Sequence, residues 1–448
     1  MRFRAVTVVV AILMIACGGT TTSTNGVQTA GSQLPALKNH VNITFWHAMS
    51  GGSQKPTIEQ LASQFNSSQS MVSVTLVNQV DYPTLRTKTL ASLAAGTPPD
   101  SAQCYPGWAD QYNQKKALAD ITPYLNAKDG FSAADLKDFF PALLKDGQLK
   151  GKQYTVPFNK STPVLYYNDE MFKEAAISAP PKTWDEFVAD AKKLNDLKPQ
   201  STQAKSSDGK HWGTDFSQAG GYEQVWEGQV VANGGSLLNK DQTKSAFNSS
   251  AGQQSIQMWA DLVKSGSAHR VSGYEDEDDL GSKHIGMMIN TIAGYSFVAK
   301  SVGGGFTLKT AQVPAGSKTA AVEMAGTNVC TFNKASQDVQ QGVFQWIKYI
   351  TSKEGTTLWS EKTGYMPVRQ SAVTEMKASF YPTNKDGGNL QVAVDQLPHA
   401  FGGPPLAVWD ESMNNILVEL VNIVDGKKSA AQGLGDAAKK TDDLLANG

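Results

Sequence analysis

The sequence predicts an α/β fold with a mainly parallel sheet, because short strand-like and helix-like segments alternate along the chain. Near the start, Val41, Ile43 and Phe45 alternate with polar residues, which is typical of a half-buried strand. After a Gly/Ser turn, apolar residues recur at helical spacing from Ile58 to Phe65. Short strand and helix units in alternation favour helices packed on a parallel sheet.

The next two elements repeat this pattern. Residues 72–76 alternate again between apolar and polar side chains. A second helix follows with Leu85, Thr89 and Leu93 on one face, and Gly96 with the two prolines after it ends that helix.

Three later helices are indicated by their ends and by their apolar faces. Thr183 and Glu186 have the spacing of a capping box, which predicts a helix start. Apolar residues recur at helical spacing from Val339 to Ile350. Ser429 is expected to cap a last helix that ends near Leu445.

Residues 1–16 are expected to be a lipoprotein signal peptide. Two arginines form a positive start, and Ala5 to Ile15 is an apolar run too short to span a bilayer. Cys17 stands where a bacterial lipoprotein precursor is cut and acylated, so we expect lipidation there; the alternative is a plain secretory signal with an incidental cysteine. Residues 17–37 are rich in Thr, Ser, Gly and Gln and are expected to form a flexible linker.

Charge and cysteine content narrow the class of protein. Of 40 basic and 41 acidic residues, Arg2 and Arg4 fall in the signal, which leaves 38 basic and 41 acidic residues, a net charge of −3. This balance argues against nucleic acid as a partner, because such binding needs a concentrated basic face. Cys104 and Cys330 allow one disulfide or two buried thiols.

The sequence carries no motif for catalysis, metal binding or a cofactor. The patterns G-x-S-x-G, H-E-x-x-H and C-x-x-C are absent. The acidic run from Glu275 to Asp279 does not fit a calcium loop, since Met287 stands where the last glutamate is needed, and a solvated loop is expected. We therefore expect no enzyme, no metal and no cofactor.

Aromatic residues beside turn residues are the chemical feature that is present. Aromatic faces stack on the C–H faces of sugars and polyols, and a core role is the alternative for each one. The residues concerned are Trp46, Tyr82, Tyr105, Trp108, Tyr222, Trp226, Tyr365 and Trp409.

Five motifs along the mature chain resemble a known family. They are ITFWHAM (43–49), FNKSTPVLYYN (158–168), PPKTWDEF (180–187), EKTGYMPV (361–368) and GKKSAAQGL (426–434). On these motifs the chain resembles the sugar-carrying solute-binding proteins of bacterial ABC importers, and within that family it is most similar to members that bind sn-glycerol-3-phosphate.

The resemblance implies a periplasmic-binding-protein-like fold of two α/β lobes joined by a hinge, with the ligand cleft between them. We expect residues 38–157 and 298–352 to form the N-terminal lobe, and residues 158–297 and 353–448 the C-terminal lobe. The chain crosses between lobes near 157–162, near 291–297 and near Ser352.

The resemblance also implies a role. The protein is expected to be a lipid-anchored monomer on the outer face of the cell membrane, which captures a carbohydrate-like ligand by hinge closure. It delivers this ligand to the permease of an ABC importer and meets the ATPase only indirectly.

Ligand-site residues carry over from the family one position at a time. Those whose motif matches are Tyr82, Ser161, Thr291, Gly326 and Tyr365. Tyr222 and Trp226 stand where the family has two cleft tryptophans, and Trp108 and Trp409 are further stacking candidates.

Two departures from the family pattern change the expected ligand. The family glutamate that holds glycerol falls on Pro106, and the arginine that grips phosphate falls near Met413. No Lys or Arg occurs from 386 to 425, and a buried phosphate needs such a partner. A neutral sugar, oligosaccharide or polyol is therefore expected.

Two alternatives stay open. A glycerol-3-phosphate or glycerophosphodiester ligand would need Lys160 or His47 as its cation, whereas Lys160 is otherwise expected to be a solvated hinge residue. A secreted carbohydrate-active enzyme would need two carboxylates across a sugar cleft, chosen from Asp410, Glu411 and Glu227.

Overall fold

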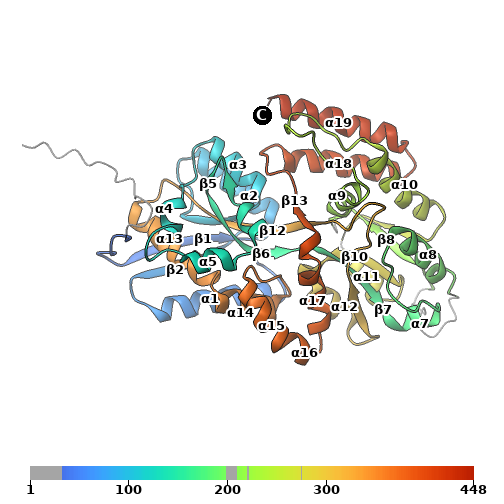
Figure 1. Ribbon diagram of the computed structural model, residues 1–448, viewed down its shortest axis with the longest axis horizontal. Helices are drawn as coiled ribbons and strands as arrows, with labels where there is room; N and C mark the ends of the chain where they lie inside the picture. The colour runs from blue at the N-terminus through green and yellow to red at the C-terminus, as the bar shows by residue number, and fades with distance from the viewer. Residues whose placement is uncertain (1–32, 198–208, 219–220, 274, 448) are drawn as a thin grey trace, which may run out of the picture.

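The computed structural model describes residues 33–197, 209–218, 221–273 and 275–447. The predicted signal peptide, Cys17 and most of the predicted linker lie outside these ranges. Figure 1 shows two α/β lobes side by side, joined through the middle of the molecule. Within the described ranges, no helix is both long enough and apolar enough to cross a membrane.

The N-terminal lobe is built on a six-stranded sheet. Its strands are β1 (Val41–His47), β2 (Val72–Asn78), β3 (Ser101–Cys104), β6 (Thr155–Ser161), β12 (Val322–Thr331) and β13 (Ala400–Gly402). β1 pairs in parallel with β2 and β3, as the sequence predicts. β12 is parallel to β13 but antiparallel to β3 and β6, so the later strands make this a mixed sheet.

Helices pack on both faces of this sheet because β1 alternates its side chains. Ile43 and Phe45 join the core of one face with the predicted helices α1 (Gln54–Ser68) and α13 (Gln337–Ile350). Trp46 packs on the other face, against the core of α2 (Tyr82–Ala94) and α3 (Pro106–Gln114). The lobe is completed by α4 (Thr122–Leu125), α5 (Ala133–Asp138), α6 (Pro141–Lys145), the hairpin β4 (Gln148–Leu149) and β5 (Lys152–Gln153), and α14 (Lys353–Thr363).

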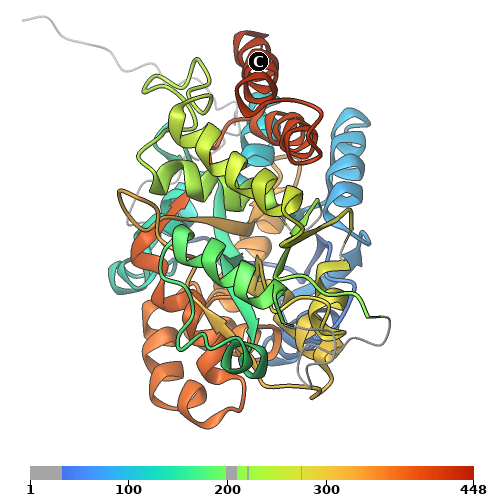
Figure 2. The ribbon, with the colours of Figure 1, turned by 90° about the vertical axis from the view of Figure 1, so that its right-hand side faces the viewer.

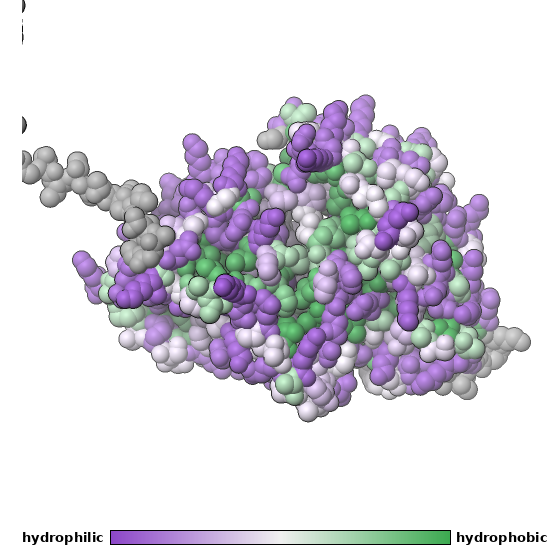
Figure 3. All heavy atoms as spheres, viewed as in Figure 1, coloured by the Kyte–Doolittle hydropathy of each residue, from purple (hydrophilic) through white to green (hydrophobic). Residues whose placement is uncertain are grey.

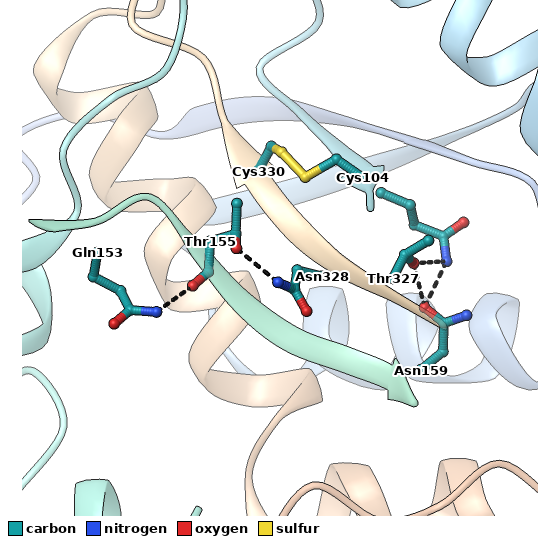
Figure 4. Close-up of a disulfide and its surroundings, with 8 residues drawn as sticks. Cys104, Gln153, Thr155, Asn159, Thr327, Asn328 and Cys330 are labelled. Atoms are coloured by element: carbon teal, nitrogen blue, oxygen red, sulfur yellow. Dashed lines mark hydrogen bonds between the residues drawn. A yellow bond between two sulfur atoms is a disulfide. The ribbon is translucent and has the colours of Figure 1, made fainter. Parts of the chain in front are cut away.

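A disulfide joins β3 to β12 (Figure 4). Cys104 and Cys330 are both buried, with their Cα atoms 6.2 Å apart and 226 residues between them in sequence. Of the two possibilities that the sequence leaves open, the structure has the disulfide. The bond ties the start of the lobe to the strand by which the chain returns to it.

The C-terminal lobe holds two small sheets. β7 (Pro163–Asn168) lies between β10 (Met287–Thr291) and β11 (Leu308–Ala311), all antiparallel, and β8 (Thr214–Ser217) pairs in parallel with β9 (Ala268–Val271). One core is formed by β7 with α8 (Trp184–Asn195), α9 (Tyr222–Ala232), α10 (Ser250–Lys264), α18 (Trp409–Val424) and α19 (Ala430–Asn447). Figure 2 looks at this lobe and shows the paired α18 and α19 in red.

A second core of this lobe lies on the other side of β7. It is formed with α12 (Tyr295–Val302), α15 (Gln370–Ala378) and α17 (Gly387–Asp395). The remaining elements are α7 (Asp169–Glu174), α11 (Glu275–Gly281), η1 (Ile292–Gly294), α16 (Phe380–Thr383) and η2 (Leu397–His399).

Local sequence signals place several helix ends correctly. The capping box of Thr183 and Glu186 forms, and α8 begins at the next residue, Trp184. Ser429 precedes α19 and its side chain accepts from the backbone N–H of Gln432. The acidic run is a correction: it forms helix α11 rather than a solvated loop, with Asp276 and Asp279 buried.

The lobe boundaries differ from the predicted ones at two crossings. The first lies between β6 and β7, next to the predicted range. The second comes after β11, because α12 and β11 pack in the C-terminal lobe although residues 298–352 are predicted to be N-terminal. The third comes after α14, because α14 contacts α1 and only α15 joins the C-terminal core. Lobe membership depends on long-range strand pairing, which hydrophobic periodicity does not reveal.

Candidate ligand-binding site

A cavity of about 420 Å³ lies between the lobes. The N-terminal lobe supplies α2, the start of α3, Asp146 and Lys160, and the C-terminal lobe supplies α9, the loop at Gly403 and α18. β12 contributes residues 323–326. The volume suits a small molecule. In Figure 3, hydrophobic residues are visible across the middle of the molecule between polar flanks.

Aromatic rings form one wall of the cavity. Tyr82, Tyr105 and Trp108 pack edge to face, with ring centroids 5.3 Å apart for Tyr82–Tyr105 and 4.9 Å for Tyr105–Trp108. Tyr82 opens α2, where the side chain of Asp81 caps the helix, and Trp108 lies in the first turn of α3 after Pro106. Flat rings fixed at two helix starts offer a preorganised stacking surface.

A polar network behind the wall orients Tyr82. Asn159 donates from Nδ2 to the Tyr82 hydroxyl oxygen at 2.9 Å. Asn159 in turn accepts from Gln103 at 2.9 Å. It also accepts from the hydroxyl of Thr327, as Figure 4 shows. Burial, with Tyr365 nearby, raises the pKa of Tyr82 well above its usual value, so the phenol stays protonated.

Both basic side chains on the cavity are already paired with carboxylates. Arg86 on α2 forms a salt bridge with Asp410 on α18, which links the two lobes, and its guanidinium carbon lies 5.8 Å from the Trp108 ring centroid. Lys160 donates to Asp146 at 2.6 Å. The Lys160 side chain is only 1% exposed, so the expectation of a solvated hinge residue is wrong.

Carboxyl groups from α9 and β12 also line the cavity. Glu223 on α9 and Glu323 on β12 line it, and the fully buried Glu227 lies behind them. Burial raises the pKa of Glu223 to about 7 and that of Glu323 to about 7, and it raises the pKa of Glu227 well above its usual value. Oε2 of Glu223 and Oε2 of Glu323 accept no hydrogen bond from a backbone, amide or hydroxyl group.

Four of the nine predicted ligand residues line the cavity. They are Tyr82, Trp108, Gly326 and Trp409. Gly326 has φ +93°, and a Cβ there would lie 2.0 Å from the carbonyl oxygen of Asn159, so the backbone requires glycine.

Three more predicted residues do not line the cavity. Ser161 is buried next to Lys160 on β6, and Tyr365 is buried against Trp359 and interacts with Tyr82. Thr291 caps the short helix η1, since its hydroxyl accepts from the N–H of Ala293 at 3.3 Å. Ser161 and Tyr365 thus adjoin residues of the cavity wall, whereas Thr291 acts at the end of β10.

Tyr222 and Trp226 are a correction, because both are buried in the core of the C-terminal lobe and line no part of the cavity. The Tyr222 hydroxyl donates to Asp215 at 2.8 Å, and Trp226 Nε1 donates to the carbonyl oxygen of Gly252 at 3.0 Å. They lie four residues apart on one face of α9, and the adjacent face carries Glu223 to the cavity.

Sequence reasoning missed most of the charged residues of the site. Those on the cavity without a predicted role are Arg86, Asp146, Glu223 and Glu323. Pro106 and Met413, the two departures from the family pattern, do line the cavity. His47 does not, and burial lowers its pKa to about 4, so it is neutral at pH 7 and provides no cation.

Comparisons with known proteins all point to bacterial solute-binding proteins. A sequence profile for bacterial extracellular solute-binding proteins matches residues 60–385. The sn-glycerol-3-phosphate-binding periplasmic protein UgpB of Yersinia pseudotuberculosis is 26% identical over 420 residues, covering 90% of this chain and 92% of the relative.

Solved structures agree on the fold. UgpB from Mycobacterium tuberculosis, in complex with glycerophosphocholine, matches with a TM-score of 0.78 at 20% identity over 91% of this chain and 98% of that one. The GacH receptor of Streptomyces glaucescens, studied unliganded and with acarbose, matches with a TM-score of 0.76 at 21% identity over 92% of this chain and 100% of that one. The predicted periplasmic-binding-protein-like fold is confirmed.

Proposed function

Since the chain belongs to the family of bacterial extracellular solute-binding proteins of ABC importers, we propose that its interlobe cavity captures a neutral sugar, oligosaccharide or polyol. The protein acts outside the cytoplasmic membrane, as its family does. In the proposed cycle, the ligand bridges the lobes, shifts the hinge toward a closed form, and is handed to a membrane permease.

The character of the cavity wall is the observation that carries this proposal. The aromatic rings of Tyr105 and Trp108 line the same cavity as the carboxyl groups of Glu223 and Glu323, and Trp108 Nε1 is a buried donor with no acceptor. A hydroxyl group both donates and accepts, so a polyhydroxylated ligand can satisfy both kinds of group while its C–H face stacks on the rings. Each hydrogen bond strengthens when closure excludes water.

A phosphate ester is the second candidate, and the names of the relatives favour it. UgpB proteins are described as binding sn-glycerol-3-phosphate or, in one structure, glycerophosphocholine. To bind here, a phosphate would have to displace Asp410 from its salt bridge with Arg86, or Asp146 from its salt bridge with Lys160. It would also lie in a cavity lined by the carboxyl groups of Glu223 and Glu323. Uncompensated burial of a phosphate is costly, which places this ligand second.

Calorimetry tests the two candidates directly. We expect a neutral sugar or polyol from a broad panel to bind with micromolar affinity, about −8 kcal/mol, and glycerol-3-phosphate and glycerophosphocholine to bind far more weakly. Tight glycerol-3-phosphate binding that disappears in Lys160→Ala would reverse this order.

The aromatic wall gives a matched pair of variants. Trp108→Ala is expected to weaken sugar binding at least tenfold, because a stacking surface is lost. Trp226→Phe is the control: it perturbs the core of the C-terminal lobe but leaves the affinity within about twofold, since Trp226 lies outside the cavity. Equal effects of the two substitutions on affinity would contradict the site.

Two finer parts of the proposal concern anchoring and chemistry. We propose that Cys17 carries the lipid that holds the protein at the membrane, on the sequence grounds given above. We also propose binding without turnover: Asp410 is held by Arg86, and Glu227 lies behind the cavity, so neither is placed as a free glycosidase carboxylate. Hydrolysis of any glycoside by the purified protein would contradict this part.

A further inference from the structure

Glu223 and Glu323 are acidic groups on the cavity that no cation among the described residues neutralises, although the carboxyl group of Glu227 is hydrogen-bonded to that of Glu323. Glu323 is only 7% exposed, and its Oε2 accepts from no backbone, amide or hydroxyl group; the same holds for Oε2 of Glu223. Buried carboxyl groups in native proteins normally have such partners, because an unsatisfied one costs folding free energy. A cavity-lining pair of this kind indicates that the missing partner is the ligand.

The charged groups around this pair offer it no cation. From α9, Glu227 faces Glu323, and from the turn after α6, Asp146 does so, itself bound to Lys160 of β6. From α18, Asp410 faces Glu223 and is held by Arg86 of α2. Both cations are thus neutralised by their own carboxylates, and the free charge that remains on the cavity is negative.

We propose that Glu323 and Glu223 form the specificity-determining subsite of the cavity, which accepts hydrogen bonds from hydroxyl or ammonium groups of the ligand and excludes phosphate esters. This inference rests on the proposed function and names the chemistry of its ligand. Carboxylates accept two or more hydrogen bonds from vicinal hydroxyl groups, and bonds to an ionised acceptor are about twice as strong as neutral ones. A phosphate dianion offers no donor and meets like charge.

Proton release on binding follows from the same arrangement. A ligand donor stabilises the ionised carboxylate, so binding lowers the pKa of these groups and releases protons near pH 7, where they are partly protonated in the free protein. The affinity for a hydroxylated ligand is therefore expected to rise from pH 5.5 to pH 8.

The test uses ligand sets that share one skeleton and differ in charge. Glucose, glucosamine and glucose-6-phosphate form one set, and glycerol and glycerol-3-phosphate form another, each titrated into wild type by calorimetry at pH 7. Within any set that binds, the phosphate ester is expected to bind at least tenfold more weakly than the uncharged member. Glucosamine against glucose distinguishes an ammonium donor from a hydroxyl donor.

Variants link the discrimination to the two carboxyl groups. In the Glu223→Gln/Glu323→Gln protein, the affinity for the phosphate ester is expected to be less than threefold weaker than that for the uncharged member. Proton release, which is measured by calorimetry in buffers of different ionisation enthalpy, is expected to disappear. Glu223→Gln alone, at a half-buried position, is expected to reduce both effects if the double variant folds poorly. Glu411→Gln is the matched control and should change neither, because Glu411 is an exposed acidic residue next to Asp410 on α18 that does not line the cavity.

The outcomes separate the inference from the proposed function. The inference alone is overturned if the protein binds a sugar and binds its phosphate ester equally tightly or more tightly. It is also overturned if the variants keep the wild-type ratio of the two affinities. Absence of binding by any sugar or polyol, in these sets and in the broad panel, overturns the proposed function and the inference with it.

Discussion

At the scale of single residues, Lys160 and Arg86 determine what the cavity can hold. They are the two basic side chains on the cavity, and each is bound to a carboxylate in this protein. Lys160 is the more deeply buried, so its pair with Asp146 cannot be treated as a surface salt bridge.

Lys160→Met is predicted to destabilise the protein by about 3 kcal/mol, because Asp146 would keep a largely buried charge without its partner. Denaturant unfolding measures this loss. The double variant Lys160→Met/Asp146→Asn should recover part of it, since the orphaned charge is gone. Lys173→Met, which breaks the exposed pair with Asp169, is the control and should have little effect; equal losses in both lysine variants would contradict a buried pair.

The buried acids predict an unusual pH dependence of stability. For Glu323 the folded pKa of about 7 lies above its ordinary value of 4.5, so the folded state binds the proton more tightly than the unfolded state. The contribution of Glu323 to the free energy of unfolding of the ligand-free protein should therefore fall as pH rises from about 4.5 to 7 and stay low above it.

Glu323→Gln removes the group that must ionise. It is predicted to raise the free energy of unfolding at pH 8 by about 2 kcal/mol relative to wild type, with little change at pH 4.5. Unfolding curves at the two pH values check this. A variant that is destabilised equally at both would show that Glu323 is a paired structural residue.

At the scale of secondary-structure elements, local patterns predicted local structure well. The alternation of Val41 to Phe45 forms β1, the capping box forms at the start of α8, and the motif from Phe158 to Asn168 spans the step from β6 to β7, which belong to different sheets. Each of these features depends on residues within about ten positions of one another, which is the range over which periodicity and capping are informative.

Features that depend on distant residues were not predictable in this way. The antiparallel pairing of β12 with β3 and the pairing of β11 with β7 join residues far apart in sequence. The face of α9 that meets the cavity is set by its packing against β12, so Glu223 lines the cavity and Trp226 does not. An aromatic residue near a turn does not reveal which face of its helix becomes buried.

A disulfide joins β3 to β12, one of the strand pairs that are distant in sequence. Cys104→Ala/Cys330→Ala is predicted to lower the free energy of unfolding by about 3 to 5 kcal/mol, because the bond closes a loop of 226 residues and restricts the unfolded chain. The thermal midpoint should fall accordingly, and wild type treated with reductant should behave like the variant. An unchanged midpoint in both would mean that the bond does not form in the purified protein.

At the scale of the whole molecule, the lobes contact each other beside the cavity. Arg86 reaches Asp410 across the gap, and Asp110 on α3 accepts from the backbone N–H of Ala407 at 3.0 Å. Partly exposed polar contacts of this kind are weak, which is compatible with the separation and closure of the lobes in the proposed cycle.

Small-angle X-ray scattering, with and without the sugar or polyol that calorimetry identifies, tests lobe closure around a ligand most directly. At saturating ligand the radius of gyration should decrease for wild type and stay at its ligand-free value for Trp108→Ala at the same concentration. Identical profiles for wild type with and without a ligand whose binding has been measured would contradict closure of the cavity.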